Sequence, residues 1–367
     1  MRLLVIPTTD WTGHPVPNRL NFIFDRLADK HDIDVCHFRI FPEPLMKTRC
    51  NLIPMDPSPM HSVDRYYLSG MKRHLTKIRD ISHEYDCVVA ANLLPTFGAS
   101  LQDTPMIVDY LDLFPQSAAA YFPNPLNIPV EKITSLIDRT NLHRSTGIIT
   151  TSASFRDRLS ARYHKPIFVV PNGVDTELIR QKKGLEDDLG YPVIGYVGSL
   201  ESWIDLERII RLFPRIVEIY PDASMLVVGP ELHTAYGKKI RKMASRYPNR
   251  IIFTGRVDYQ DLPRYISSMD VGLNPRKNML MNTLTMGSKV LNYLACGVPV
   301  LSTNMPEMEN EFGPENAVFS YHSDHEFLSA LPKALDTRVD PDIIKRYDWD
   351  SIAQLYERAI KDILKQG

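Results

Sequence analysis

Short runs of apolar residues alternate with longer mixed segments along the chain. In the first half, the apolar runs predict strands, which are Leu3–Ile6, Asp32–Phe38, Asp86–Ala90, Met106–Asp109, Gly147–Thr151 and Ile167–Val170. The segments between them predict helices, which include one with Leu20, Ile23, Phe24 and Leu27 on a single face, Tyr66–Ile81, Val130–His143 and Ser154–Tyr163. Strands separated by helix-length segments are typical of a parallel, doubly wound sheet.

A second series of the same kind follows a charged, glycine-punctuated segment at residues 180–190. Its predicted strands are Val193–Val197, Met225–Val228, Ile251–Phe253, Val271–Leu273 and Val298–Leu301, and its predicted helices are Leu206–Ile219, Ala235–Tyr247, Gln260–Met269 and Ser288–Ala295. The pattern predicts an α/β protein with two Rossmann-like, doubly wound domains, residues 1–180 and 181–345. Residues 346–367 predict a last helix that packs across the domain junction.

Four of the five strands in the second series end at glycine or at Asn-Pro. These ends are Gly198, Gly229, Gly255 and Asn274-Pro275. A single glycine often only turns the chain. Repetition along one edge indicates a binding edge, because ligands of open α/β sheets lie at the carboxyl ends of strands and glycine lets them approach the backbone.

The segment from Asn274 to Thr303 reads as strand, loop, helix and strand, with Thr285, Gly287 and Ser288 at the helix start. A helix N-terminus offers unpaired N–H groups and a partial positive charge, which suits a phosphate. Lys289 lies in the first helical turn, where the helix dipole repels it unless an anion is present. The alternative is a solvated lysine on an ordinary strand–helix unit.

Composition narrows the function classes. The 367 residues suit two domains, and the net charge of −1 gives no general attraction to nucleic acid. The four cysteines are scattered, so neither a disulfide framework nor a zinc site is indicated. The first apolar run has four residues, too short for a signal peptide or a membrane span. We therefore expect a cytoplasmic protein.

Residues 40–63 contain five prolines and exclude a long regular element. Overlapping them, residues 46–79 carry seven Lys or Arg against two acids, with Tyr66, Tyr67, Leu68 and Met71 among them. Such a segment fits peripheral contact with an anionic membrane surface. A solvated amphipathic helix is the alternative.

Several strings of the second half, in their order and spacing, are similar to one family. They are Val170–Asp175, Ile194–Ser199, Phe253–Val257, Asp270–Pro275 and Ser288–Val300. Together they resemble glycosyltransferases of the two-Rossmann GT-B architecture, particularly the retaining family-four group. The resemblance covers roughly residues 145–365 well, and the N-terminal half in layout only.

The resemblance implies a UDP- or GDP-sugar donor in a cleft between the domains, no cofactor, no metal, and transfer with retention to a glycan or lipid-linked acceptor. The donor-binding residues it points to, with neighbouring candidates, are Gly13, Gly198, Ser199, Arg256, Val257, Arg276, Lys277, Thr285, Met286, Gly287, Ser288, Lys289 and Asn292. Polysaccharide or glycolipid assembly is the expected setting.

The sequence departs from the family at three places. The usual pair of glutamates is replaced by Leu284 and Asn292, a usual arginine by Ser199, and a usual histidine near the acceptor by Leu111. Arg276 and Lys277 could supply the missing positive charge, or they could be exposed loop residues.

Candidate catalytic groups follow from chemistry. Asp109 and Asp112, at the end of a strand, could orient or deprotonate an acceptor hydroxyl, and His14 in the first strand–helix loop could approach either substrate. Structural turn or cap roles are the alternative for each. The missing carboxylates leave two further functions open, a catalytically silent nucleotide-sugar-binding subunit and a nucleotide-sugar epimerase.

Overall fold

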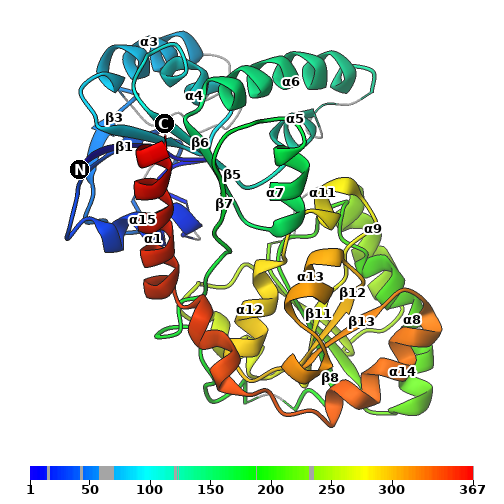
Figure 1. Ribbon diagram of the computed structural model, residues 1–367. Coiled ribbons are helices and arrows are strands. Elements are labelled where there is room, and N and C mark those ends of the chain that lie inside the picture. Colours follow the sequence, from blue (N-terminus) through cyan, green and yellow to red (C-terminus); the bar gives the residue numbers. More distant parts are fainter. Residues whose placement is uncertain are drawn as a thin grey trace. The chain divides into compact units, whose positions relative to one another are not determined.

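A computed structural model describes residues 1–14, 17–41, 44–57, 70–119, 122, 124–186, 188–230 and 235–366. The chain folds into two compact units, shown in Figure 1. Unit 1 contains Met1–Pro171 and Trp349–Gly367, and unit 2 contains Asn172–Asp348. The C-terminal helix therefore belongs to the same unit as the N-terminus.

Unit 1 is built on a parallel sheet of seven strands in the order β3-β2-β1-β4-β5-β6-β7. The strands are β1 (Arg2–Ile6), β2 (Asp32–His37), β3 (Asn51–Pro54), β4 (Cys87–Ala90), β5 (Met106–Tyr110), β6 (Gly147–Thr150) and β7 (Ile167–Val169). The winding direction reverses between β1 and β4, so loops that follow these strands at their carboxyl ends form a natural ligand position.

Helices complete unit 1. They are α1 (Arg19–Leu27), α3 (Met71–Ser82), α4 (Leu94–Ala99), α5 (Phe114–Ala119), α6 (Asn127–Arg144), α7 (Ala153–Ser160) and α15 (Trp349–Gln366). Helix α15 lies beside α1, where Phe22 stacks on Trp349 with ring centroids 4.8 Å apart and Phe24 meets Tyr356 edge to face. These aromatic contacts join the two ends of the chain in one hydrophobic core.

Unit 2 has a parallel sheet of six strands in the order β10-β9-β8-β11-β12-β13. The strands are β8 (Val193–Val197), β9 (Ser224–Val228), β10 (Ile251–Gly255), β11 (Val271–Asn274), β12 (Val300–Thr303) and β13 (Val318–Tyr321). The helices are α8 (Leu206–Ile219), α9 (Ala235–Ala244), α10 (Leu262–Ile266), α11 (Leu280–Thr283), α12 (Ser288–Ala295), α13 (Pro306–Glu311), α14 (Asp324–Leu335) and the 3₁₀ segments η1 (Pro314–Asn316) and η2 (Pro341–Tyr347).

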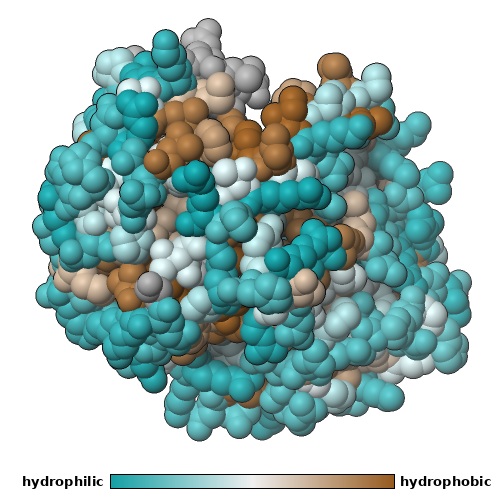
Figure 2. Space-filling model, turned by 45° about the horizontal axis from the view of Figure 1, so that its top comes forward, coloured by the Kyte–Doolittle hydropathy of each residue, from teal (hydrophilic) through white to brown (hydrophobic). Residues whose placement is uncertain are grey.

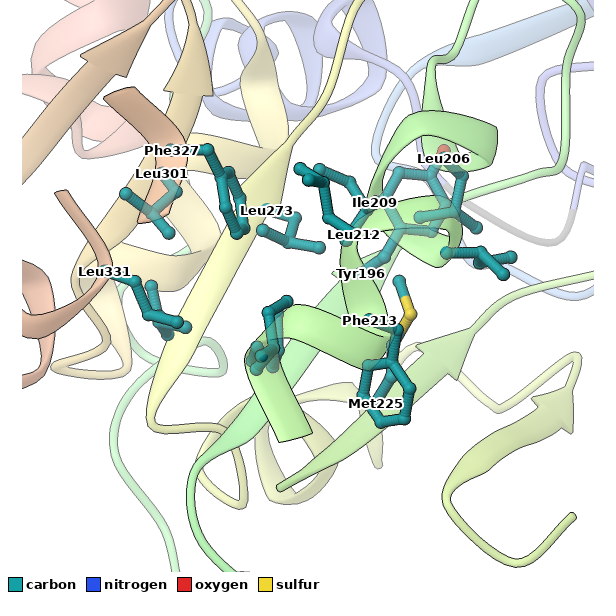
Figure 3. Packing of buried hydrophobic residues seen from close by; sticks show 14 of the residues in the cluster. Tyr196, Leu206, Ile209, Leu212, Phe213, Met225, Leu273, Leu301, Phe327 and Leu331 are labelled. Atoms are coloured by element: carbon teal, nitrogen blue, oxygen red, sulfur yellow. The ribbon is translucent and has the colours of Figure 1, made fainter. Parts of the chain in front are cut away.

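Two hydrophobic clusters fill the core of unit 2. One contains α8 and α14, and Figure 3 shows Leu206, Ile209 and Phe213 of α8 packed with sheet residues and with Phe327 and Leu331 of α14. The other contains Val290, Leu291 and Leu294 of α12. Helix α12 is therefore held by its apolar side, which fixes the position of its N-terminus.

The prediction of two doubly wound α/β sheets is confirmed. Sequence reasoning missed β3 in the proline-rich segment and β13 near residue 320. Both are edge strands, and Pro54 is the last residue of β3, where a missing N–H costs little. The predicted helix over residues 66–81 is described from Met71 onward, and residues 58–69 lie outside the described residues.

Candidate functional site

The candidate site of unit 2 lies where the sheet reverses its winding direction. Strands β8 and β11 are neighbours, yet they pair only at Ile194 with Val271 and at Gly195 with Gly272. Beyond this point the strands separate, and their ends at Val197 and Asn274 flank the start of α12. Ligands of open parallel sheets bind at such a reversal, outside the carboxyl ends of the strands.

Tyr293 of α12 bridges the two separating strands. Its hydroxyl accepts a hydrogen bond from the Val197 N–H at 2.8 Å and donates to the Leu273 carbonyl at 3.2 Å. Its ring lies so close to Gly272 that a Cβ there would be 2.5 Å from Cγ of the tyrosine. Sequence reasoning missed Tyr293, and the only signal was a tyrosine on the apolar face of this helix.

Two glycines shape the edge beside β8. Gly198 has φ +137° and Gly229 has φ +147°, conformations that side chains rarely adopt. A Cβ on Gly229 would lie 2.2 Å from the Gly198 carbonyl oxygen, and one on Gly198 would lie 2.7 Å from Nζ of Lys289. Glycine at residue 198 therefore leaves room for the lysine head.

Lys289 points its ammonium group toward this edge. Nζ lies 3.2 Å from the Tyr196 hydroxyl and 4.5 Å from the centroid of that ring. The Tyr196 hydroxyl in turn donates to the Ser199 carbonyl at 2.9 Å. Burial, followed by the nearby charge of Arg276, lowers the pKa of Lys289 to about 7. Within the described part of the chain, no carboxylate forms an ion pair with Lys289.

Arg276 comes from the loop after β11 and reaches the same place. Its Nη1 donates to the Thr285 hydroxyl at 2.7 Å, and its backbone N–H donates to the Thr303 hydroxyl at 2.9 Å. The guanidinium is close enough to Lys289 to lower the pKa of that lysine. Two cations thus converge beside one helix start.

The N-terminus of α12 adds backbone donors to the two cations. Gly287 is the N-cap and carries no side chain that could cap the helix. Met286 and Gly287 are buried, Thr285 is half-buried and Ser288 is exposed. A Cβ on Gly287 would lie 2.9 Å from Oδ1 of Asn274, so the loop passes close to β11. First-turn N–H groups and the helix dipole favour an anion here.

The remaining predicted donor residues of unit 2 are Lys277, Arg256, Val257 and Asn292. Nζ of Lys277 donates to the Ser202 carbonyl at 2.6 Å and lies 4.8 Å from the Tyr236 ring centroid, so this cation is engaged with protein groups. Arg256 is exposed and Val257 half-buried after β10, the edge strand two positions from β8. Asn292 is half-buried on α12, one turn beyond Lys289.

In unit 1, Asp10 organises the loop after β1 that carries Gly13 and His14. Its buried carboxylate accepts from the N–H groups of Gly13 at 2.9 Å and Ile40 at 2.9 Å. Burial works against ionisation, but hydrogen bonds from His37 and from backbone N–H groups lower the pKa of Asp10 to about 2. The half-buried ring of His14 lies 6.1 Å from the Phe41 ring. Sequence reasoning missed Asp10.

Asp109 occupies the core of unit 1. Its carboxylate is fully buried and lies 3.3 Å from Nε of Arg19, whose Nη1 donates to the Val170 carbonyl at 3.0 Å. Burial outweighs the Arg19 charge and raises the pKa of Asp109 to about 6. The prediction that Asp109 orients an acceptor hydroxyl conflicts with this burial, because a substrate hydroxyl cannot reach the carboxylate here.

Asp112 is half-buried at the start of α5. One carboxylate oxygen accepts from the Leu113 N–H at 2.7 Å and the other from the Ser117 hydroxyl at 2.6 Å. These are helix-start contacts. Over the described residues, no group of three or more His, Cys, Asp or Glu side chains could hold a metal ion, and no helix is long and apolar enough to cross a membrane.

Comparison with known proteins identifies the family of the chain. Residues 191–337 match the family described as glycosyl transferases group 1, and residues 20–178 match glycosyltransferase family 4. The first matched region lies in unit 2, and the second lies mainly in unit 1. This chain belongs to the group 1 glycosyltransferases of GT-B architecture.

Individual relatives are distant. The glycosyltransferase TuaH, assigned to teichuronic acid biosynthesis in Bacillus subtilis, is 28% identical over 51% of this chain and 48% of its own length. A GDP-mannose-dependent mannosyltransferase of Corynebacterium glutamicum, named for a monoacylated phosphatidylinositol monomannoside, is 26% identical over 43% of this chain and 40% of its own. The matches thus span about half the length of these curated relatives.

A solved structure shows the same fold over the whole length. HepE from Anabaena, solved in complex with UDP, superimposes with a TM-score of 0.68 at 14% identity, covering 99% of this chain and all of HepE. At this identity the likeness establishes the architecture alone.

Proposed function

We propose that this protein transfers a sugar from a nucleoside-diphosphate sugar to a glycan or lipid-linked acceptor, with retention and without a metal. The observation that carries the proposal is the convergence of Lys289 and Arg276 on the N-terminus of α12. Two neighbouring cations in a partly buried place repel each other, and an anion with two or more negative charges removes that repulsion. A diphosphate has this charge.

The same groups would promote the reaction. When the bond between the sugar and the diphosphate breaks, negative charge builds on the leaving phosphate. The Arg276 guanidinium, the Lys289 ammonium and the N–H groups at Gly287 and Ser288 are held in place before the reaction, so they stabilise that charge without rearranging. In this proposal the positive charge replaces what a metal would supply.

The nucleoside of the donor is assigned to residues of α12 and to the loop after β10. Asn292 stands where the family carries a glutamate for the ribose, and it can hydrogen-bond a hydroxyl, though less strongly than a carboxylate. HepE was solved with UDP, whereas the mannosyltransferase relative is named for GDP-mannose. Uridine and guanosine donors both fit the proposal, and Arg256 with Val257 stays a prediction for the base.

The acceptor is assigned to unit 1. His14 and Asp112 lie at the carboxyl ends of strands in its sheet, on the loops after β1 and β5. We propose that they hold the acceptor hydroxyl, and that a lipid-linked acceptor is reached at the inner face of the membrane by a cytoplasmic enzyme. The cations predicted to contact a membrane within residues 46–79 are in part engaged with protein, since Lys77 donates to the Pro54 carbonyl and Arg73 pairs with Asp56.

Nucleotide binding tests the proposal directly. UDP and GDP are titrated into the protein by calorimetry, and release of sugar from the matching donor is then measured. We expect one nucleotide to bind, and Lys289→Ala to weaken its binding by about 1–3 kcal/mol. Absence of binding by either nucleotide would refute the proposal.

A silent nucleotide-sugar-binding subunit is the second candidate. Leu284, Asn292 and Leu111 stand where the family carries two glutamates and a histidine, and the buried Asp109 is engaged with Arg19. Donor binding without hydrolysis or transfer to any acceptor would favour this function. An epimerase would instead interconvert the donor sugar without an acceptor, which product analysis of the same incubation detects.

A further inference from the structure

Helices α5, α6 and α7 of unit 1 border a cavity of about 140 Å³. Part of its lining is buried and apolar, and Tyr110 of β5 meets Phe155 of α7 edge to face there, with ring centroids 5.7 Å apart. Figure 2 shows hydrophobic residues next to hydrophilic ones in the upper part of the view, on the side of unit 1 that carries α6. A cavity of about this volume holds a molecule the size of benzene, so only a small ligand fits.

Three arginines also line this cavity. Arg139 belongs to α6, Arg158 to α7, and Arg162 to the turn that follows α7. Arg158 is half-buried, and the other two are exposed. Among the described residues, none of the three guanidinium groups forms an ion pair or a hydrogen bond with another group.

Other arginines of the same helices are engaged with protein groups. Arg156 of α7 pairs with Asp157 at 2.9 Å, and Nη1 of Arg144 of α6 donates to the Ser100 carbonyl at 3.2 Å. The arginines of the cavity therefore differ from their neighbours in lacking such partners within the described part of the chain. Three like charges around one small space repel each other, and an anion between them would remove this repulsion.

Two acids line the cavity without neutralising these arginines. The buried carboxylate of Asp138 accepts a hydrogen bond from the Tyr110 hydroxyl at 3.0 Å. Burial raises the pKa of Asp138 to about 6, against the hydrogen bond from Tyr110 and the charge of Arg139. Glu131 is exposed and forms no ion pair with a described residue. The guanidinium groups thus stay available to a ligand.

We propose that this cavity binds a small phosphate monoester, with its phosphate on Arg139, Arg158 and Arg162 and its remaining atoms against Tyr110 and Phe155. A guanidinium presents planar pairs of N–H donors that match phosphate oxygens, and two negative charges suit a set of cations better than one. The volume limits the rest of the ligand to a few carbon and oxygen atoms.

This site is separate from the cations at the start of α12, because every residue that lines the cavity belongs to unit 1. It adjoins the segment after β5, since Leu113 and Gln116 line the cavity and Asp112 precedes them. A bound phosphate monoester would therefore contact the segment that carries a proposed acceptor residue.

Calorimetry of the full chain with glycerol 3-phosphate tests the proposal, with no nucleotide present and with glycerol as the uncharged counterpart. We expect glycerol 3-phosphate to bind and glycerol not to bind. Arg158→Gln and Arg139→Gln should each weaken the binding about tenfold or more, because each removes charge-assisted hydrogen bonds to the phosphate. Thermal unfolding without ligand verifies that both variants are folded.

Two further variants are matched controls. Arg156→Gln removes an arginine of the same helix that is already paired, and Arg276→Gln/Lys289→Gln removes the two cations of unit 2. Each should change the affinity for glycerol 3-phosphate by less than about twofold. Wild-type protein that does not bind glycerol 3-phosphate overturns the proposal. Loss of binding in the unit 2 variant, with Arg158→Gln binding as the wild type does, also overturns it.

A transfer assay distinguishes two sources of the phosphate, and this step alone rests on the proposed function. Competition between glycerol 3-phosphate and the acceptor would mean that the cavity holds a phosphate of the acceptor. A changed rate without competition would mean that it holds a free effector. Because binding is measured without a donor, failure of sugar transfer leaves the binding result intact.

Discussion

Each unit holds buried charge, and the two arrangements are opposite in kind. In unit 1, Arg19 and Asp109 form an ion pair inside the core, and the Val170 carbonyl, just after β7, also accepts a hydrogen bond from the arginine. In unit 2, Lys289 and Arg276 are two cations side by side, and no carboxylate of the described residues pairs with the lysine. In the first arrangement the carboxylate and the cation balance each other, whereas in the second an anion would balance the charge of the lysine.

The comparison distinguishes a buried charge with a structural role from one that binds a ligand. Both groups have displaced pKa values, with Asp109 raised to about 6 and Lys289 lowered to about 7, and burial is the first cause in both. A displaced pKa alone therefore does not identify a site. What distinguishes the two is whether a nearby charge of opposite sign is part of the protein.

The largest expected effect comes from breaking the pair in unit 1. Asp109→Ala leaves the Arg19 guanidinium buried without its carboxylate, and we expect a loss of about 3–5 kcal/mol in the free energy of unfolding. Urea titration of the purified variant measures this. Replacing both residues, as Arg19→Leu/Asp109→Leu, should restore much of the loss.

Asp112→Ala is the control for this experiment. Besides its proposed place at the acceptor hydroxyl, the Asp112 carboxylate supports the start of α5, so its loss should lower the free energy of unfolding by only about 1 kcal/mol. If Asp109→Asn instead unfolds like the wild type and abolishes sugar transfer, then Asp109 reaches the reacting hydroxyl and the structural assignment is wrong.

The second largest effect is expected on nucleotide binding in unit 2, where two neighbouring cations of one loop are compared. Arg276→Gln should weaken nucleoside-diphosphate binding by about 1.5–3 kcal/mol, because a charge-assisted hydrogen bond to phosphate is lost. Lys277→Gln should cost less than about 1 kcal/mol, since Lys277 is engaged with the Ser202 carbonyl and the Tyr236 ring. Equal losses in calorimetry would contradict the assignment.

A third effect concerns stability without ligand. Lys289 has a lowered pKa in the folded protein, so the unfolded chain binds its proton more readily between pH 7 and the ordinary lysine range. The buried lysine therefore lowers the free energy of unfolding most below about pH 7. This destabilisation decreases as pH rises toward the pKa of the lysine in the unfolded chain. Lys289→Met should raise the free energy of unfolding at pH 7 by about 1–2 kcal/mol.

Thermal unfolding at pH 7 and at pH 9.5 checks this prediction. The stabilisation by Lys289→Met should be larger at pH 7 than at pH 9.5. Lower stability of the variant at pH 7 would show that the lysine is held by a group that balances its charge, which would remove the contrast with Asp109.

The smallest effect is expected from a variant that restores the glutamate of the family at residue 292. Asn292→Glu should strengthen donor binding by about 0.5–1 kcal/mol if residue 292 meets the ribose, because a carboxylate accepts a stronger hydrogen bond than an amide. Asn292→Ala is the control and should weaken binding. Weaker binding by the glutamate variant would place residue 292 away from the sugar hydroxyls.

The architecture, and the residues at the carboxyl ends of the strands of unit 2, could be predicted from the sequence because their signals are local. Apolar strand patterns, glycines at strand ends and the helix start at Gly287 all appear in consecutive residues. Contacts between distant residues were not predictable. Tyr293 meets β8 and β11 only after the sheet has formed, and Asp10 meets Ile40 and Phe41 across a loop.

The same limit applies to Asp109, whose burial conflicts with the role predicted for it. In sequence it stands at the end of a strand, where a catalytic carboxylate is often found, as Asp112 does three residues later. Whether a carboxylate near a strand end faces a ligand or the core depends on the helices that pack there. Here α1 supplies Arg19, and α15, more than 200 residues later, supplies the Tyr356 ring that covers the pair.

The central claim is that Lys289 and Arg276 bind the diphosphate of the donor. Proton uptake on nucleotide binding tests this claim most directly. A free pKa near 7 leaves Lys289 about half protonated at pH 7, and a bound diphosphate should complete its charge. Affinity should therefore fall as pH rises above 7. The phosphates of the nucleotide also exchange protons on binding. Comparing the wild type with Lys289→Gln cancels this contribution.

The measurement is calorimetry of UDP and GDP binding at pH 7 in buffers of different ionisation enthalpy. The account predicts that the wild type takes up about half a proton more than Lys289→Gln and binds the nucleotide more tightly. Equal proton uptake and equal affinity in the two proteins would contradict it.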